Sequence, residues 1–181
     1  MKVEELGVEM MARTGATHKF TVTYEDLADT AGTALTQTLF DDGLAGMDVQ
    51  FVGHRVIRQF DGGATSELTV AIGYDLASGT DDADGFQAAT SVHADGSPVD
   101  YTPVIIGDVA TDTVDGTYGT EESTVIGSLR TKLNSALKQC RIKFGEAFDI
   151  EAVWTATGAN LTALTAGEVA FYFRIVDTNK V

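Results

Sequence analysis

Residues 148–176, FDIEAVWTATGANLTALTAGEVAFYFRIV, contain the clearest strand pattern in this chain. The first run, 148–157, alternates apolar and polar residues with the period of a half-buried strand. The second run, 168–176, is β-branched or aromatic at nearly every position and is apolar on both faces. A strand with two apolar faces must be covered on both sides, either inside a sandwich or against another copy of the protein.

Further strands are predicted by short β-branched and aromatic runs at 19–24, 33–40, 47–60, 67–74 and 101–109. The turn Asp61-Gly62-Gly63 makes residues 47–60 and 67–74 the best candidates for a hairpin. Five Asp-Gly pairs punctuate the first two thirds of the chain, and Asp-Gly tolerates the positive φ of tight turns. Turns at this density between short strands indicate an all-β sandwich or barrel.

One segment departs from the β pattern. Apolar residues on one side of a helical wheel predict one inserted helix near residues 123–138. Residues 1–16 are expected to form a weakly structured N-terminal arm, because glycines interrupt their helical spacing. Residues 77–100 are acidic and glycine-rich, which favours a long loop. The expected organisation is an N-terminal arm over 1–16 and a single β-sandwich domain over 17–181.

Composition argues against several classes of protein. A net charge of −15 argues against nucleic acid as a partner, because a phosphate backbone attracts basic surfaces. No stretch approaches the roughly 18 apolar residues of a membrane span, and the N-terminus lacks the apolar core of a signal peptide. A single cysteine, Cys140, excludes an internal disulfide framework. We therefore expect a chain made in a cytoplasm, with neither nucleic acid nor membrane as a partner.

Charge is unevenly distributed along the chain. No lysine or arginine occurs between Arg58 and Arg130, whereas 13 acidic residues occur from Asp61 to Glu122. A basic cluster follows, formed by Arg130, Lys132, Lys138, Arg141 and Lys143. Two interpretations stay open: a basic patch that meets a neighbouring acidic surface, or solvated loops beside a solvated helix face.

The residues offer little catalytic chemistry. His18, His54 and His93 lie far apart and in none of the spacings of a zinc site, so each is expected to be a packed or surface histidine. Cys140 lies among basic residues, but burial in the core is the favoured interpretation. No nucleophile elbow, phosphate loop or dinucleotide fingerprint occurs. We expect no catalytic residues, no cofactor and no enzyme activity.

A metal site has one weak candidate. Asp81, Asp82 and Asp84 place three carboxylates within four residues, and such oxygens suit calcium. The EF-hand pattern fails, because Thr80 and Ser91 stand where ligand carboxylates belong. An acidic solvated loop is therefore the favoured interpretation.

Four segments, in order along the chain, resemble a known group of proteins: 20–27 (FTVTYEDL), 60–70 (FDGGATSELTV), 82–86 (DADGF) and 154–169 (WTATGANLTALTAGEV). They are similar to small β-sandwich virion proteins of tailed bacteriophages, which include capsid decoration (cement) proteins. The resemblance implies a jelly-roll-like sandwich, a homotrimer and the major capsid protein as partner. It also implies a place in the virion, on the outside of the head, after synthesis in the host bacterial cytoplasm. That family has no catalytic residues to carry over.

Two parts of the chain are candidates for contacts in such an assembly. The basic cluster, Arg130 to Lys143, is one candidate for gripping the shell, and the N-terminal arm is the other. Phe171 and Phe173 are further interface candidates, because the apolar strand that carries them lies in the core or at a subunit seam.

Three other functions stay open at this point. One is another virion component, in a tail, a baseplate or a head fibre. A second is a carbohydrate-binding β-sandwich that holds calcium on its acidic loop, although Trp154 lies on an apolar strand face, which predicts core packing instead of a sugar platform. A third is a small hydrolase that uses His54 or His93.

Overall fold

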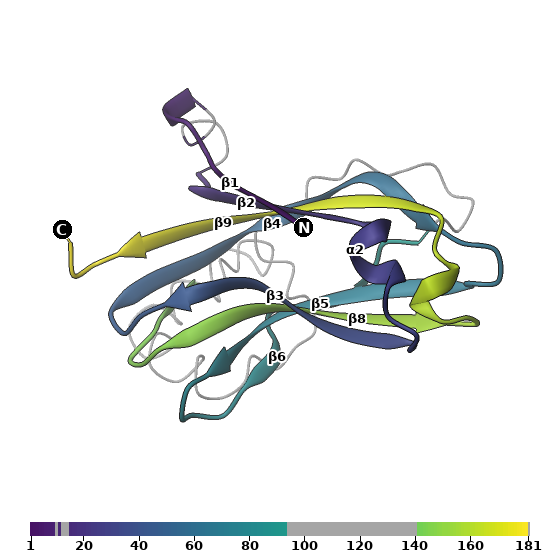
Figure 1. Ribbon diagram of the computed structural model, residues 1–181. Coiled ribbons are helices and arrows are strands. Elements are labelled where there is room, and N and C mark those ends of the chain that lie inside the picture. The colour runs from purple at the N-terminus through teal and green to yellow at the C-terminus, as the bar shows by residue number, and fades with distance from the viewer. Residues whose placement is uncertain (10, 12–14, 94–140, 181) are drawn as a thin grey trace, which may run out of the picture.

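Two antiparallel sheets make up the structure, a computed structural model that describes every residue except 10, 12–14, 94–140 and 181 (Figure 1). Sheet A contains, in spatial order, β1 (Lys2–Glu5), β2 (His18–Thr23), β9 (Ala166–Asp177), β4 (Met47–Asp61) and β7 (Arg141–Lys143). Sheet B contains β3 (Ala34–Gly43), β8 (Phe148–Thr157), β5 (Glu67–Leu76) and β6 (Asp82–Ser91). The sheets face each other across one core, which confirms the predicted all-β sandwich.

The strands pair in the nested order of a jelly roll. β2 pairs with β9, β3 with β8, β4 with β7 and β5 with β6, so strands early in the chain meet strands late in it. The pairings of β4 with β9 and of β5 with β8 join these pairs into two sheets. This arrangement confirms the jelly-roll-like sandwich that the resemblance implies. β1 adds a fifth strand to sheet A beside β2.

The predicted hairpin between residues 47–60 and 67–74 is wrong. β4 belongs to sheet A and β5 to sheet B, so the turn Asp61-Gly62-Gly63 connects the two sheets. Glycine is required at position 62, because a Cβ atom there would lie 2.2 Å from the carbonyl oxygen of Ala163. A turn between sheets has the same local sequence as a turn within one sheet, and only the partners of the flanking strands distinguish them.

The acidic segment over 77–100 is predicted as a loop, but the structure places a strand in it. β6 (Asp82–Ser91) pairs with β5 through a ladder that has two register shifts. Such shifts break the alternation of apolar and polar residues, so periodicity does not reveal the strand. The predicted strand at 101–109 and the predicted helix at 123–138 lie outside the described residues.

Part of the predicted weakly structured arm over 1–16 is also a strand. β1 pairs with β2 along its whole length. The Glu4 carboxylate accepts hydrogen bonds from the ammonium groups of Lys2, at 2.5 Å, and Lys19, at 3.1 Å. Backbone pairing to an open sheet edge needs no apolar periodicity, so a short charged strand leaves no signal in the sequence.

A short helix and a 3-10 turn close one end of the sandwich (Figure 1). α2 (Tyr24–Ala28) follows β2, and η2 (Leu161–Ala163) lies between β8 and β9. Each of the two buries one leucine, Leu27 in α2 and Leu161 in η2. Both side chains belong to the cluster between the sheets, so the two elements shield that end of the core from water.

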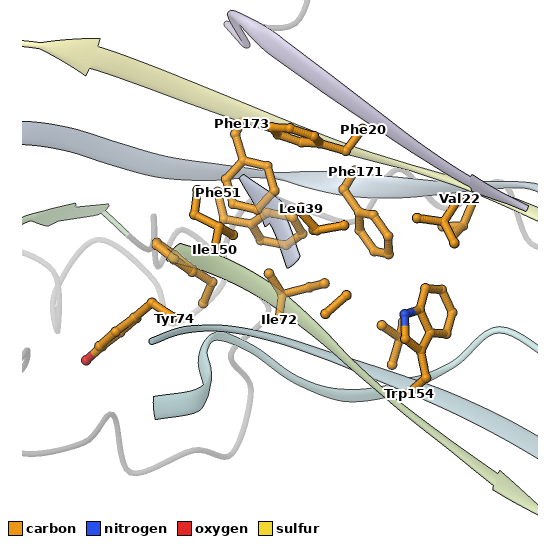
Figure 2. Packing of buried hydrophobic residues seen from close by; sticks show 14 of the residues in the cluster. Phe20, Val22, Leu39, Phe51, Ile72, Tyr74, Ile150, Trp154, Phe171 and Phe173 are labelled. Carbon is orange, nitrogen blue, oxygen red and sulfur yellow. The ribbon is translucent and has the colours of Figure 1, made fainter. Parts of the chain in front are cut away.

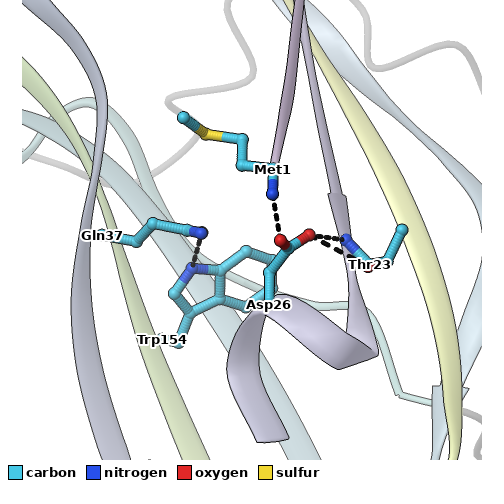
Figure 3. A network of polar contacts seen from close by, with 5 residues as sticks. All are labelled: Met1, Thr23, Asp26, Gln37 and Trp154. Carbon is cyan, nitrogen blue, oxygen red and sulfur yellow. Dashed lines mark hydrogen bonds and ion pairs between the residues drawn. The ribbon is translucent and has the colours of Figure 1, made fainter. Parts of the chain in front are cut away.

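Polar contacts near this end have partners inside the chain (Figure 3). The Asp26 carboxylate accepts hydrogen bonds from the backbone N–H of Thr23, at 2.8 Å, and from its hydroxyl, at 2.9 Å, and it also pairs with the amino group of Met1. Trp154 is fully buried, and its Nε1–H donates to the Oε1 of Gln37 at 3.3 Å. The indole is thus a core residue, as its position on an alternating strand predicts.

Aromatic rings fill the space between the sheets (Figure 2). Phe171 and Phe173 of β9 are fully buried. The ring centroid of Phe171 lies 6.1 Å from that of Trp154, and the ring centroid of Phe173 lies 5.8 Å from that of Phe86. Phe171 and Phe173 are therefore core residues and not the interface residues that were predicted, because both side chains are buried within a single chain. Tyr172, between them, points to the outer side of sheet A and is half-buried.

Replacing Phe171 with alanine should lower the free energy of unfolding by about 3–5 kcal/mol, the usual cost of emptying a buried aromatic site. Tyr172→Ala is the matched control, because the next residue on β9 lies on the opposite face of the strand. It should cost less than about 1.5 kcal/mol. Chemical denaturation followed by Trp154 fluorescence measures both values. Equal losses in the two variants would contradict this assignment of the two faces.

Candidate docking surface

The two sheets divide the charged residues unequally. The strands of sheet A contain seven cations beside six carboxylates, and the cations are Lys2, Lys19, Arg55, Arg58, Arg141, Lys143 and Arg174. The strands of sheet B contain no lysine or arginine, and their eight carboxylates are Asp41, Asp42, Glu67, Asp75, Asp82, Asp84, Asp149 and Glu151. Sheet A is therefore close to neutral, whereas sheet B is strongly acidic.

Register and alternation show which side chains point outward from sheet A. Phe173 of β9 faces the core, so Arg174 faces outward. Arg174 lies opposite Gln50 of β4, and Gln50 lies opposite Arg141 of β7. By the same alternation all seven cations stand at outward positions, and four carboxylates accompany them: Glu4, Asp48, Asp61 and Glu168. We call this outer surface of sheet A the cationic face.

A pocket of about 280 Å³ lies on the cationic face, across β9, β4 and β7. Its lining residues are Asp48, Gln50, Arg141, Arg174, Val176 and Thr178. Nε of Arg141 donates to both carboxylate oxygens of Asp48, at 2.7 and 2.9 Å, and Nη2 of Arg141 also bonds to Asp48. Arg174 is exposed, and within the part of the chain that the structure describes it makes no hydrogen bond or ion pair.

The pocket combines predicted and unpredicted residues. Arg141 and Lys143, both predicted as interface candidates, stand at outward positions of β7, and Lys143 lies opposite Asp48. The other basic candidates lie outside the described residues: Arg130, Lys132 and Lys138. Sequence reasoning misses Arg174 and Gln50, because β9 and β4 become neighbours only in the fold. A lone arginine within an apolar run is the one signal that indicates an outward position there.

Sheet B presents a cluster of carboxylates on its outer side. Asp75 of β5 lies directly opposite Asp149 of β8, and Glu151 follows on the same face. A hydrogen bond with Asp81, together with the negative charges of Asp81 and Asp149, raises the pKa of Asp75. Partial burial and the charges of Asp75, Asp149 and Asp81 raise the pKa of Glu151. These carboxylates therefore repel one another in the folded state.

Two of the three weak calcium candidates, Asp81, Asp82 and Asp84, use their carboxylates to accept backbone N–H groups. The Asp81 carboxylate accepts the N–H of Leu76 at 3.0 Å, and the Asp82 carboxylate accepts the N–H of Asp84 at 3.3 Å. Among the residues that the structure describes, no group of three or more acidic, histidine or cysteine side chains is arranged to hold a metal ion. Asp82 and Asp84 belong to strand β6, and Asp81 precedes it.

The three histidines have separate surroundings. His54 is buried between the sheets, where its Nδ1–H donates to the Oε1 of Gln87 at 2.7 Å, and burial lowers its pKa. A neutral amide does not orient and stabilise an imidazolium as a carboxylate does. His18 stacks on Phe20, and burial lowers the pKa of His18 as well. His93 is buried, and neither of its ring nitrogens has a hydrogen-bond partner among the described residues.

The fold and this surface define a jelly-roll sandwich with a cationic face and an acidic face. No protein-family model, curated protein or solved structure matches this chain. Within the described ranges, no helix is long and apolar enough to cross a membrane. The geometry of the two faces is therefore the structural guide to function.

Stability should depend on pH through His54. Because burial lowers the pKa of His54 in the folded state, the unfolded state, with an ordinary pKa of 6.5, binds the proton more tightly. The free energy of unfolding should keep its full value above pH 6.5 and should fall as the pH drops below 6.5. Urea unfolding between about pH 8 and about pH 5 measures the decline. The free energy of unfolding of the His54→Gln variant should decline less over this pH range. If the variant declined as much as the natural chain, His54 would not be the group responsible.

Removing one carboxylate from sheet B should stabilise the fold. The pKa of Glu151 is raised, so its charged form is disfavoured in the folded state, and this group adds stability only as the pH falls. Glu151→Gln should raise the free energy of unfolding at neutral pH by at most about 0.5 kcal/mol, because the side chain is largely solvated. The gain should shrink in about 1 M salt. A variant less stable than the natural chain would show that repulsion does not dominate at this position.

Proposed function

We propose that this chain is a capsid decoration (cement) protein, which binds the outside of a tailed-phage head and stabilises the shell by non-covalent contacts between capsid subunits. Its partner is the major capsid protein, and it acts as a homotrimer without catalysis or a cofactor. The observation that carries the proposal is the division of charge between the two sides of the sandwich. The resemblance of segments 20–27, 60–70, 82–86 and 154–169 to such proteins supports it independently.

A protein that lies on a large surface needs two unlike sides. The strands of sheet B carry eight carboxylates and no cation, a composition that keeps crowded copies soluble and mutually repulsive on the side that meets solvent. Sheet A carries its cations on the opposite side, where complementary charge guides a docking protein to the correct orientation. The fold thus separates a side for contact from a side for solvent.

The jelly roll supplies a rigid body for this role. Its aromatic core closes within one chain, so the docking side is formed before binding and little conformational entropy is lost on contact. A stable interface buries roughly 1,200–2,000 Å². Repetition over a symmetric shell multiplies modest contacts into a large total affinity. Contact area of this kind resists the outward pressure of packaged DNA without chemistry.

Two measurements test the proposal. The purified chain should have three times the 19.1 kDa mass of one copy in solution. Added to heads of the encoding phage prepared without it, the chain should sediment with the heads and raise the temperature at which they release DNA. The control is the same titration with isolated tails. Preferential binding to tails would point to another virion component, and an unchanged release temperature on saturated heads would exclude a stabilising role.

A further inference from the structure

We infer that the pocket beside Arg174 is the point at which the chain binds its partner, and that the group received there is a carboxylate side chain of an acidic segment of the capsid subunit. This inference deepens the proposed function and rests on it for the identity of the partner. The pocket would recognise a single carboxylate. The sandwich would lie with sheet A toward the shell and sheet B away from it.

Arg174 is the group that carries the inference. Its side chain is exposed, and it has no ion pair or hydrogen bond within the described ranges 1–93 and 141–180 apart from the few omitted residues. The carboxylates on the same face are elsewhere: Glu4 binds Lys2 and Lys19, and Asp48 binds Arg141. Glu168 and Asp61 lie toward the other end of the ladder between β4 and β9, opposite Arg58 and Ala166. A guanidinium presents a planar fork of donors that matches the two oxygens of a carboxylate. Arg174 therefore offers a fork that no described acid of its own chain occupies.

The remaining lining residues prepare the pocket for an acceptor. Gln50 lies directly opposite Arg174 and contributes an amide that donates as well as accepts. The Asp48 side chain is only 11% exposed, and its ion pair holds the Arg141 guanidinium in the wall of the pocket. Val176 adds an apolar contact beside these polar groups. A preformed wall of this kind lowers the entropic cost of binding.

The charge of the lining selects the kind of anion. Arg141 is already neutralised by Asp48, which leaves one uncompensated positive charge, that of Arg174. The Asp48 carboxylate in the wall disfavours a doubly charged ion such as phosphate, because like charges at short range repel. One positive charge with a fork of donors matches one singly charged carboxylate. An aspartate or glutamate side chain is therefore the occupant that this pocket favours.

A second copy of this chain is a poorer occupant, although sheet B is rich in carboxylates. The cationic face and sheet B are on opposite sides of the sandwich, so a contact between them would add copies head to tail in an open row. Such a row does not close into a trimer. Each copy also carries a net charge of −15, which opposes close approach of its equals. The capsid subunit is the partner that avoids both difficulties.

Charge reversal at Arg174 tests the inference on DNA-filled heads of the encoding phage prepared without this protein. Arg174→Glu should weaken binding by roughly tenfold or more, because it replaces the donor fork with a repelling carboxylate. Arg58→Glu, at the far end of the same face and also exposed, is the matched control and should lose less than about threefold. Equal losses of affinity in the two variants would show that the whole face attracts the shell diffusely, and would overturn the inference that the pocket beside Arg174 is the binding site. Arg174→Lys should fall between, since lysine keeps the charge and loses the fork.

A titration without heads separates this inference from the proposed function. A short oligo-glutamate peptide, added at low salt, should shift the side-chain Nε–H resonance of Arg174 in a saturable way, and inorganic phosphate should compete weakly. If the chain fails to bind heads, the proposed function is wrong, and the peptide titration alone then tests whether the pocket binds a carboxylate. Saturable binding that Arg174→Glu abolishes and Arg58→Glu retains would support the pocket. No shift at Arg174, or tighter binding of phosphate than of the peptide, would overturn it.

Discussion

Two sheets close over one layer of aromatic side chains, and the other features of the fold follow from this packing. β9 lies between β2 and β4, and β8 lies between β3 and β5, so the last two strands form hydrogen bonds with strands from the first half of the chain. Phe171 and Trp154, from these two central strands, lie 6.1 Å apart across the interior. Because the inward positions of the strands are filled by this apolar layer, most charged side chains of the strands point outward. The charge on the outer surface of each sheet is therefore set by the charged residues that its strands contain.

The division of charge follows from the way the jelly roll sorts its strands. The chain passes repeatedly from one sheet to the other, so that β1, β2, β4, β7 and β9 collect in one sheet and β3, β5, β6 and β8 in the other. The cations of the described strands all fall in the first group. A sequence in which lysine and arginine are scarce over a long central stretch thereby becomes a body with two unlike sides. Under the proposed function, such sorting would orient the protein on the shell.

Sequence reasoning succeeds where a strand has a strong period and fails where its partner decides the outcome. The segments at 148–157 and 168–176 are strands as predicted, because alternation or continuous β-branched and aromatic residues identify them without reference to neighbours. β6 is missed because bulges disturb its period, and β1 because a charged edge strand has none. The predicted hairpin fails for a third reason: Asp61-Gly62-Gly63 permits a turn but does not state which sheet the next strand joins.

The all-β class, the burial of the residues around Trp154 and the excess of acid in the centre of the chain could be predicted from the sequence, because these depend on composition and on local periodicity. The fold was needed to show that Phe171 and Phe173 lie inside one chain and that Arg174, Gln50 and Arg141 line one pocket. Strand partners in a jelly roll are separated by more than a hundred residues in some pairs, as Gln50 and Arg174 are. No local pattern encodes such a pairing, since it arises from the packing of two whole sheets against each other.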